Sequence, residues 1–178
     1  MKTSQLISEL KEMTLAHVLE AEKFQLLKLE QLNKKQNDTS WSILECLEHL
    51  NLYGDFYIPE INKRMQESNS TPNENYKSGL LGNYFAKSML PNEKLNTMKT
   101  FKNMNPNGSS LDSSIIDRFL KQQSALLEIL KIAETKNIQK IKTSISISNL
   151  IKLRLGDSLR VVVYHNKRHI AQAKRNTN

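Results

Sequence analysis

Apolar residues recur at intervals of three and four positions along several stretches of this chain. In the first stretch the repeat consists of Ile7, Leu10, Thr14, His17, Ala21, Phe24 and Leu27. Such spacing puts one stripe of side chains on a single face of a helix with about 3.6 residues per turn. The pattern therefore predicts a long amphipathic helix over residues 4–32.

A second helix is predicted over residues 41–67, after a polar connector. Thr39 or Ser40 is expected to cap its start, because a hydroxyl oxygen accepts a hydrogen bond from a backbone N–H that lacks a helical partner. Pro59 lies inside this helix. Proline removes one backbone donor and crowds the preceding turn, so we expect the helix to bend or divide there.

Residues 68–111 show no sustained helical repeat and contain runs rich in Ser, Asn, Pro and Gly, which favour loops. A short helix is predicted near residues 79–89. So long a connection between helices is unusual and often shapes the entrance of a site. A third long helix is then predicted over residues 112–135.

The alternating residues 138–155 are compatible with a strand, but a lone strand would lack a partner, so we predict an extended connector. A last helix is predicted over residues 157–175, with Asp157 or Ser158 as its cap. Four long helices, with a long irregular crossover between the second and third, predict an all-α four-helix bundle that forms one domain over residues 1–178.

The composition narrows the class of protein. Hydrophobic residues make up 38% of the chain and charged residues 25%, as in soluble globular proteins. The N-terminus is polar where a signal peptide would be apolar, and no run approaches the roughly 18 apolar residues of a membrane span. The single cysteine, Cys46, excludes an internal disulfide. We therefore expect a cytoplasmic protein without a membrane partner.

The formal net charge is +8, which raises the question of an anionic partner such as nucleic acid. The lysines are scattered, however, and no block of five like charges occurs. A solvated basic surface is the favoured interpretation, and nucleic-acid binding is the weaker alternative.

His165 and His169 provide the first candidate chemistry. Four positions turn a helix by about 400°, so both imidazoles leave one face about a turn apart and could bind one ion. Val161 and Val162 precede them on that face and Gln172 follows, so the face is expected to point inward. Buried imidazoles need polar partners. The alternative is a solvated helix face, on which such pairs are common.

His49 strengthens the case for a metal. It shares a helix face with Cys46, Tyr53 and Phe56, and a histidine in such surroundings is either a hydrogen-bonded core residue or a ligand. Three histidines from two helices would leave positions open on a metal for water or substrate. Tyr53 and Phe56 are expected to form the wall of a pocket.

Two motifs resemble those of the DinB/YfiT-like superfamily. Residues 41–50, WSILECLEHL, have a tryptophan at the helix start and a histidine two turns later, as in that superfamily's second helix. Residues 165–173, HNKRHIAQA, resemble its closing motif H-x-x-R-H-x-x-Q-a. With the helix order and the irregular middle region, the resemblance extends over nearly the whole chain.

The resemblance implies a bundle with one divalent metal ion held by His49, His165 and His169. Imidazole suits zinc, nickel, iron and copper alike, so the ligands do not name the metal. Relatives include metal-dependent transferases of low-molecular-weight thiols such as bacillithiol or mycothiol, which implies a small-molecule substrate. Hydrolysis and non-catalytic metal or ligand binding by a stress protein are the alternatives. Homodimers are common among such relatives and are a further expectation.

Neighbouring residues have both a site interpretation and a plainer one. Glu45, one turn before His49, could orient that ring, or lie at the surface near the helix start. Gln172 could support a ligand ring, contact substrate, supply a fourth ligand or cap the polar end of its face. Arg168 could bind an anionic group of a substrate, or form a salt bridge on its helix.

Three further residues are interpreted as structural. His17 is expected to be a buried or rim histidine outside the site. Cys46 could ligate a metal near His49, but free cysteine is usually a small buried hydrophobe. Trp41 is expected to anchor the start of the second helix in the core.

Overall fold

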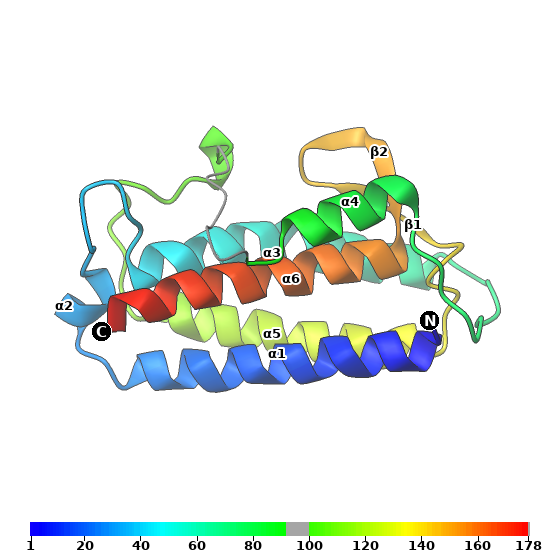
Figure 1. The fold of residues 1–178 in the computed structure, drawn as a ribbon, viewed down its shortest axis with the longest axis horizontal. Coiled ribbons are helices and arrows are strands. Elements are labelled where there is room, and N and C mark those ends of the chain that lie inside the picture. Colours follow the sequence, from blue (N-terminus) through cyan, green and yellow to red (C-terminus); the bar gives the residue numbers. More distant parts are fainter. Residues whose placement is uncertain (92–99, 178) are drawn as a thin grey trace.

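The structure is a computed structural model that describes residues 1–91 and 100–177. Its four long helices lie side by side (Figure 1): α1 Thr3–Gln25, α3 Ile43–Gln66, α5 Ser114–Ala133 and α6 Leu155–Lys174. Both α1 and α3 pack on α5 and on α6, so the four helices surround a common interior. The predicted all-α four-helix bundle is confirmed.

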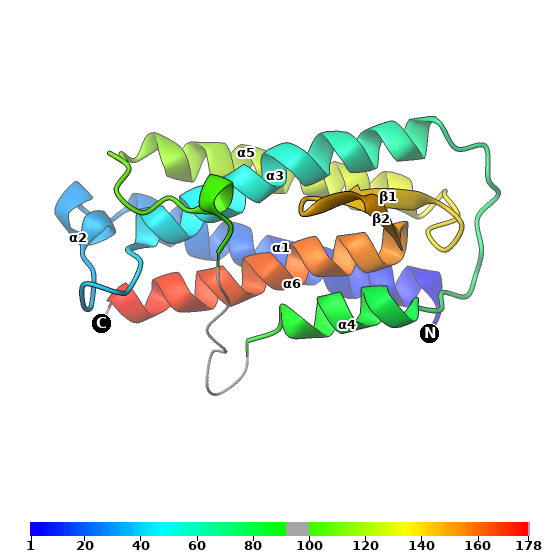
Figure 2. The same ribbon diagram turned by 90° about the horizontal axis from the view of Figure 1, so that it is seen from above.

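The direction of the helices explains the long crossover between α3 and α5. The Asn51 side chain donates to the backbone oxygen of Ile115, which joins the early parts of both helices, so α3 and α5 run parallel. The chain must therefore return along the bundle before α5 begins. Part of this return is helix α4, Leu80–Ser88, which packs along α6 (Figure 2). The short helix predicted near residues 79–89 is confirmed.

The prediction of one helix over residues 4–32 is wrong beyond Gln25. The backbone N–H groups of Leu26 and Leu27 bond only three residues back, which closes the helix with a tight turn. A separate short helix, α2 Leu29–Asn33, then packs on α3 and buries Leu32. The turn brings Leu32 back to the core. In a helix that continued straight from α1, Leu32 would lie beyond the core.

Helix α3 begins with Ser42 as its cap, and not with Thr39 or Ser40 as predicted. The Glu45 N–H donates to Ser42 Oγ at 3.1 Å, and the Ser42 N–H donates to the Glu45 carboxylate at 2.8 Å. This reciprocal capping box satisfies two backbone donors at once. Downstream, α3 continues through Pro59 without dividing. Pro59 lies on the exposed side of the helix, where water can bond the carbonyl that lacks its N–H partner.

The extended connector predicted over residues 138–155 is instead a β-hairpin. Strand β1, Lys142–Ile145, pairs antiparallel with β2, Ser148–Arg154, so the missing partner is supplied by the next stretch of the same segment. The carboxylate of Glu60 on α3 accepts a hydrogen bond from the Ser144 N–H at 2.8 Å. The hairpin is thereby attached to the bundle.

Helix α6 starts two residues earlier than predicted, and neither Asp157 nor Ser158 caps it. The Asp157 carboxylate is fully buried and accepts hydrogen bonds from the Tyr76 hydroxyl at 2.5 Å and the Gly79 N–H at 2.9 Å. It therefore ties the crossover to the first turn of α6. Two short 3-10 helices complete the described structure, η1 Lys102–Met104 and η2 Arg175–Thr177.

Two apolar clusters fill the bundle, one toward each end. One cluster includes Phe119 on α5 and Ile170 on α6. The other includes Leu126 on α5 and Tyr164 on α6. Between these positions lie polar or titratable residues that border the site described below: Gln122, Gln123, His165, Asn166, Arg168 and His169. None of the helices in the described residues has the length and apolar character needed to cross a bilayer.

Candidate metal centre

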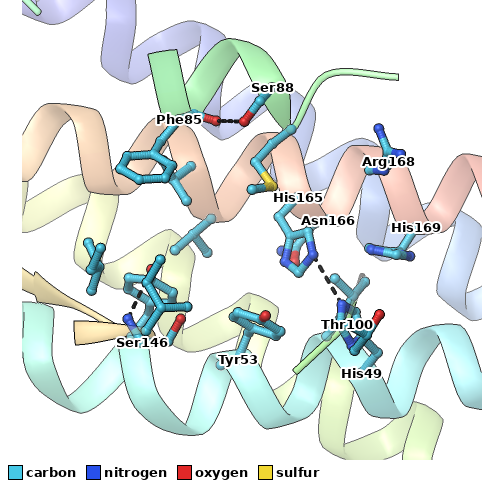
Figure 3. A pocket seen from close by; sticks show the side chains of 18 of the residues that line it. His49, Tyr53, Phe85, Ser88, Thr100, Ser146, His165, Asn166, Arg168 and His169 are labelled. Carbon is cyan, nitrogen blue, oxygen red and sulfur yellow. Dashed lines mark hydrogen bonds between the residues drawn. The ribbon is translucent and has the colours of Figure 1, made fainter. Parts of the chain in front are cut away.

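The three histidines expected as ligands lie together inside the bundle. His49 comes from α3, and His165 and His169 come from one face of α6 (Figure 3). Their ring centroids are 4.5 to 5.0 Å apart in every pair. One nitrogen of each ring lies within 4.8 Å of the others, so the group has the composition and proximity to hold a metal ion. We call these three residues the histidine triangle.

Hydrogen bonds outside the triangle orient two of its rings. His49 Nδ1 lies 2.7 Å from the backbone oxygen of Met104, and His169 Nδ1 lies 2.9 Å from Gln172 Oε1. Both acceptors are oxygens, so each ring carries its hydrogen on Nδ1 and keeps an Nε2 lone pair. Metal-binding histidines are commonly held in this way, with the second ring nitrogen donating to an oxygen.

The separation between His49 Nε2 and His165 Nε2 is 3.2 Å. Two nitrogens bound to one zinc at about 2.05 Å, at an angle of about 100°, would be separated by this distance. The full set spans up to 4.8 Å, so one ring would have to turn inward to complete it. Since His49 Nε2 is an acceptor, the short contact requires a hydrogen on His165 Nε2 or a cation in its place. The residues present therefore fit a divalent transition metal.

Burial keeps the triangle uncharged. Desolvation lowers the pKa of His49 to about 4, although the Met104 carbonyl opposes the shift. The pKa values of His165 and His169 are also well below 6.5, first because of burial and then because of positive charge on neighbouring groups. A neutral imidazole is the form that binds metal, so the site is ready at neutral pH without losing a proton.

Aromatic rings shield the triangle. The Trp41 ring stacks on His169 with centroids 5.6 Å apart and lies 4.8 Å from His49. Tyr53 packs its edge against His165, 4.7 Å between centroids. Trp41 is half-buried and packs against the apolar cluster at the start of α3, as expected of an anchor, and its ring also covers the site. Both rings reduce the access of water to the triangle.

The triangle opens into a cavity of about 720 Å³. Its walls come from Thr39 and Trp41 ahead of α3, from α3, α4, α5 and α6, from the hairpin and from residues 100–101. They include Trp41, Tyr53, Tyr57, Phe85, Met89, Phe101, Gln122, Gln123, Leu126, Ile145, Ser146, Leu153, Val161, Val162, Asn166 and Arg168. Phe85 and Ser146 lie at the end away from His49 and His169 (Figure 3). A volume of this size suits a small-molecule ligand.

A family model described as the DinB superfamily matches residues 12–173, which include both sequence motifs and all three histidines. The chain belongs to the DinB superfamily. This result confirms the resemblance drawn from the motifs around Trp41 and His165. Neither a comparison with curated proteins nor one with solved structures gives a match.

In this DinB superfamily chain, some neighbours of the triangle lie elsewhere than expected. Glu45 is buried and bonds Ser42, and its carboxylate pairs with Lys35 Nζ at 2.7 Å, so it secures the start of α3 and not the ring of His49. Phe56 packs against Tyr57, with centroids 5.1 Å apart, whereas Tyr53 lines the cavity.

Arg168 and Gln172 both line the cavity beside the triangle. Arg168 is buried, and desolvation lowers the pKa of its guanidinium. The Gln172 side chain accepts a hydrogen bond from His169 Nδ1. Of the roles considered for Gln172, it therefore has that of supporting a ligand ring.

The other titratable candidates are buried outside the cavity. His17 lies on α1, and burial, together with the charge of Lys167, lowers its pKa to about 4. Cys46 lies in an apolar cluster, where burial raises the pKa of its thiol and leaves it inert. Neither belongs to the group of residues that could hold a metal.

Sequence reasoning missed three groups at the site. The Met104 carbonyl lies at the end of the short 3-10 helix η1, where no sequence pattern indicates which backbone oxygen will meet a side chain. Gln123 and Asn166 form a buried pair, with Asn166 Nδ2 donating to Gln123 Oε1 at 3.0 Å. A signal existed for Gln123, because it interrupts the apolar stripe of α5 between Phe119 and Leu126.

Proposed function

We propose that this chain binds one divalent metal ion through His49, His165 and His169 and uses it to transfer a low-molecular-weight thiol to a small electrophile. One observation carries the proposal: three uncharged, buried imidazoles converge at the wall of a cavity of about 720 Å³. Three protein ligands are typical of catalytic metal sites, which keep a position open for a reactant. Imidazole donors suit zinc, nickel or iron.

When bound, a divalent ion lowers the pKa of a coordinated thiol, so that thiolate becomes available at neutral pH. The chain's residues provide the setting for the reaction. The Met104 carbonyl and Gln172 hold two rings with their Nε2 lone pairs directed inward. Trp41 and Tyr53 exclude water from the same region. Arg168, in the cavity wall, can pair with a carboxylate of the thiol.

In the proposed reaction the thiol releases its proton to solvent. Its sulfur then bonds to the electrophilic carbon, and the leaving group departs with the electron pair of its former bond. The described cavity wall consists of apolar, aromatic and uncharged polar side chains together with the triangle and Arg168. This lining supports thiol transfer in preference to hydrolysis, since a coordinated thiol needs no carboxylate as base, whereas metal-dependent hydrolysis of water-stable bonds commonly employs one.

The test combines metal analysis with turnover. Protein purified without added metal is loaded separately with Zn²⁺, Ni²⁺ and Fe²⁺, and bound metal is counted. Conjugation of monochlorobimane is then followed with bacillithiol, mycothiol and glutathione. We expect about one ion per chain, and turnover that a chelator abolishes and metal restores.

His165→Ala is expected to lose both stoichiometric metal and turnover. His17→Ala is the matched control, because His17 is also a buried histidine but lies outside the triangle. Metal binding that persists unchanged in both His49→Ala and His165→Ala would refute the ligand set. Stoichiometric metal without turnover of any thiol would refute the transferase and leave a metal- or ligand-binding protein.

A further inference from the structure

The cavity contains a pair of buried carboxamides that the proposed chemistry does not use. Gln123 on α5 is 3% exposed and Asn166 on α6 is 5% exposed, and both line the cavity. They occupy the polar level between the two apolar clusters of the bundle. Asn166 directly follows His165, so the pair adjoins the histidine triangle.

The hydrogen bond between the two side chains leaves part of each one available. Among the described residues, the 3.0 Å bond from Asn166 Nδ2 to Gln123 Oε1 is the one hydrogen bond that either side chain makes. The Gln123 NH₂ group and the Asn166 carbonyl oxygen remain. If both amides were turned over, the bond would run the other way, and again one NH₂ group and one carbonyl would remain. The pair therefore offers one donor and one acceptor in either assignment.

Gln123 interrupts the apolar stripe of α5, which a leucine at that position would continue. The remaining Gln123 Nε2 and Asn166 Oδ1 atoms are not among the buried side-chain atoms that lack a hydrogen-bond partner, so they face the space of the cavity. Neighbouring Gln122 shows the contrast. Its Nε2 donates to the Asn51 carbonyl at 3.0 Å and to Asp55 at 2.9 Å, so its amide is used within the fold.

We infer that Gln123 and Asn166 bind an uncharged group that carries both a donor and an acceptor, such as a primary carboxamide or a lactam, on an otherwise apolar small molecule. This inference deepens the proposed function, because the molecule would be the electrophile. Its apolar body would pack on side chains such as Leu126 and Val162, and its amide would place the reacting carbon beside the triangle. A site with a buried donor and a buried acceptor binds analogues weakly when they leave either group unpaired.

Three probes of equal size test the inference: 2-naphthamide, 2-acetylnaphthalene, which lacks the donor, and 2-naphthoate, which is charged. Each is titrated calorimetrically into metal-free and zinc-loaded protein. We expect the amide to bind about three- to tenfold more tightly than the ketone in both forms, as for one added neutral hydrogen bond. In the assigned orientation Asn166→Leu removes the acceptor, so it should abolish this preference while ketone affinity stays within about twofold. Gln123→Leu removes the donor to the carbonyl that both probes carry, so it should weaken the binding of amide and ketone alike.

Gln122→Leu is the matched control, because it removes an adjacent cavity-lining amide that is already bonded to α3, and the preference should survive. Equal affinity of wild-type protein for amide and ketone would overturn the inference, as would loss of the preference in Gln122→Leu. Tighter binding of 2-naphthoate than of the amide to metal-free protein would overturn the uncharged class. The preference for the amide is measured in metal-free protein, so its result does not depend on metal binding. The inference can therefore be supported even if the protein binds no metal, and it can be refuted even if the protein does bind metal.

Discussion

Replacing His17 with leucine should remove part of the acid sensitivity of this fold. His17 is buried on α1, and its Nδ1 atom has no hydrogen-bond partner among the residues that the structure describes. Burial is the main cause that lowers its pKa from 6.5 to about 4, and the nearby charge of Lys167 adds to it. The folded protein therefore resists protonation of this ring.

The sign and size of the effect follow from proton linkage. Between pH 6.5 and about 4 the unfolded chain binds a proton at His17 that the folded chain does not. Stability is thus fully present above pH 6.5 and is lost as the pH falls toward 4. Lowering the pKa of His17 from 6.5 to about 4 corresponds to about 3 kcal/mol of stability in total, of which about 2 kcal/mol is lost by pH 5.

The measurement compares guanidinium unfolding of metal-free wild type and His17→Leu at pH 7.5 and pH 5. Wild type should lose about 2 kcal/mol more than the variant over this interval. The three histidines of the triangle also resist protonation, but they are present in both proteins and cancel in the difference. Equal losses in the two proteins would show that His17 does not titrate as its burial requires.

Three other outcomes are expected from unfolding experiments at neutral pH. Ser42→Ala should cost about 1 kcal/mol because α3 loses its capping box, whereas Thr39→Ala, ahead of the helix, should change stability by less than about 0.5 kcal/mol; equal effects would contradict the cap assignment. Tyr76→Phe should cost about 2 kcal/mol, since its hydroxyl donates to the buried Asp157 carboxylate, and a neutral effect would mean that this bond contributes nothing. When the free metal concentration is about 100 times its Kd, removing the metal should lower the free energy of unfolding by about 2.7 kcal/mol. An unchanged denaturation midpoint would contradict binding of metal to the folded state.

The parts of the fold that sequence reasoning predicted depend on local geometry. Local sequence patterns located the four long helices and α4, because apolar spacing and cap residues indicate a helix without reference to the rest of the chain. The pairing of His165 with His169 was predicted for the same reason, since four positions make about one helical turn. The position of His49 relative to them came from the motif resemblance, because local spacing cannot bring two helices together.

The parts that were wrong depend on contacts between distant segments. Residues 142–154 form a hairpin that is bonded to Glu60 on α3, so its shape reflects a surface the local pattern does not describe. The turn after Gln25 is likewise directed by burial of Leu32 against α3. Asp157 was expected to serve its own helix, but its carboxylate instead meets Tyr76, 81 positions away.

The hairpin also has an evolutionary consequence. It contributes Ile145, Ser146 and Leu153 to the far wall of the cavity, and it is held to α3 through Glu60 and the Tyr57 hydroxyl. The histidine triangle stands on α3 and α6 and takes no residue from it. Insertions or exchanges in the turn between β1 and β2 can therefore alter the length and shape of the cavity while the arrangement of the three imidazoles is retained. The cavity wall and the histidine triangle are thus free to diverge separately in evolution.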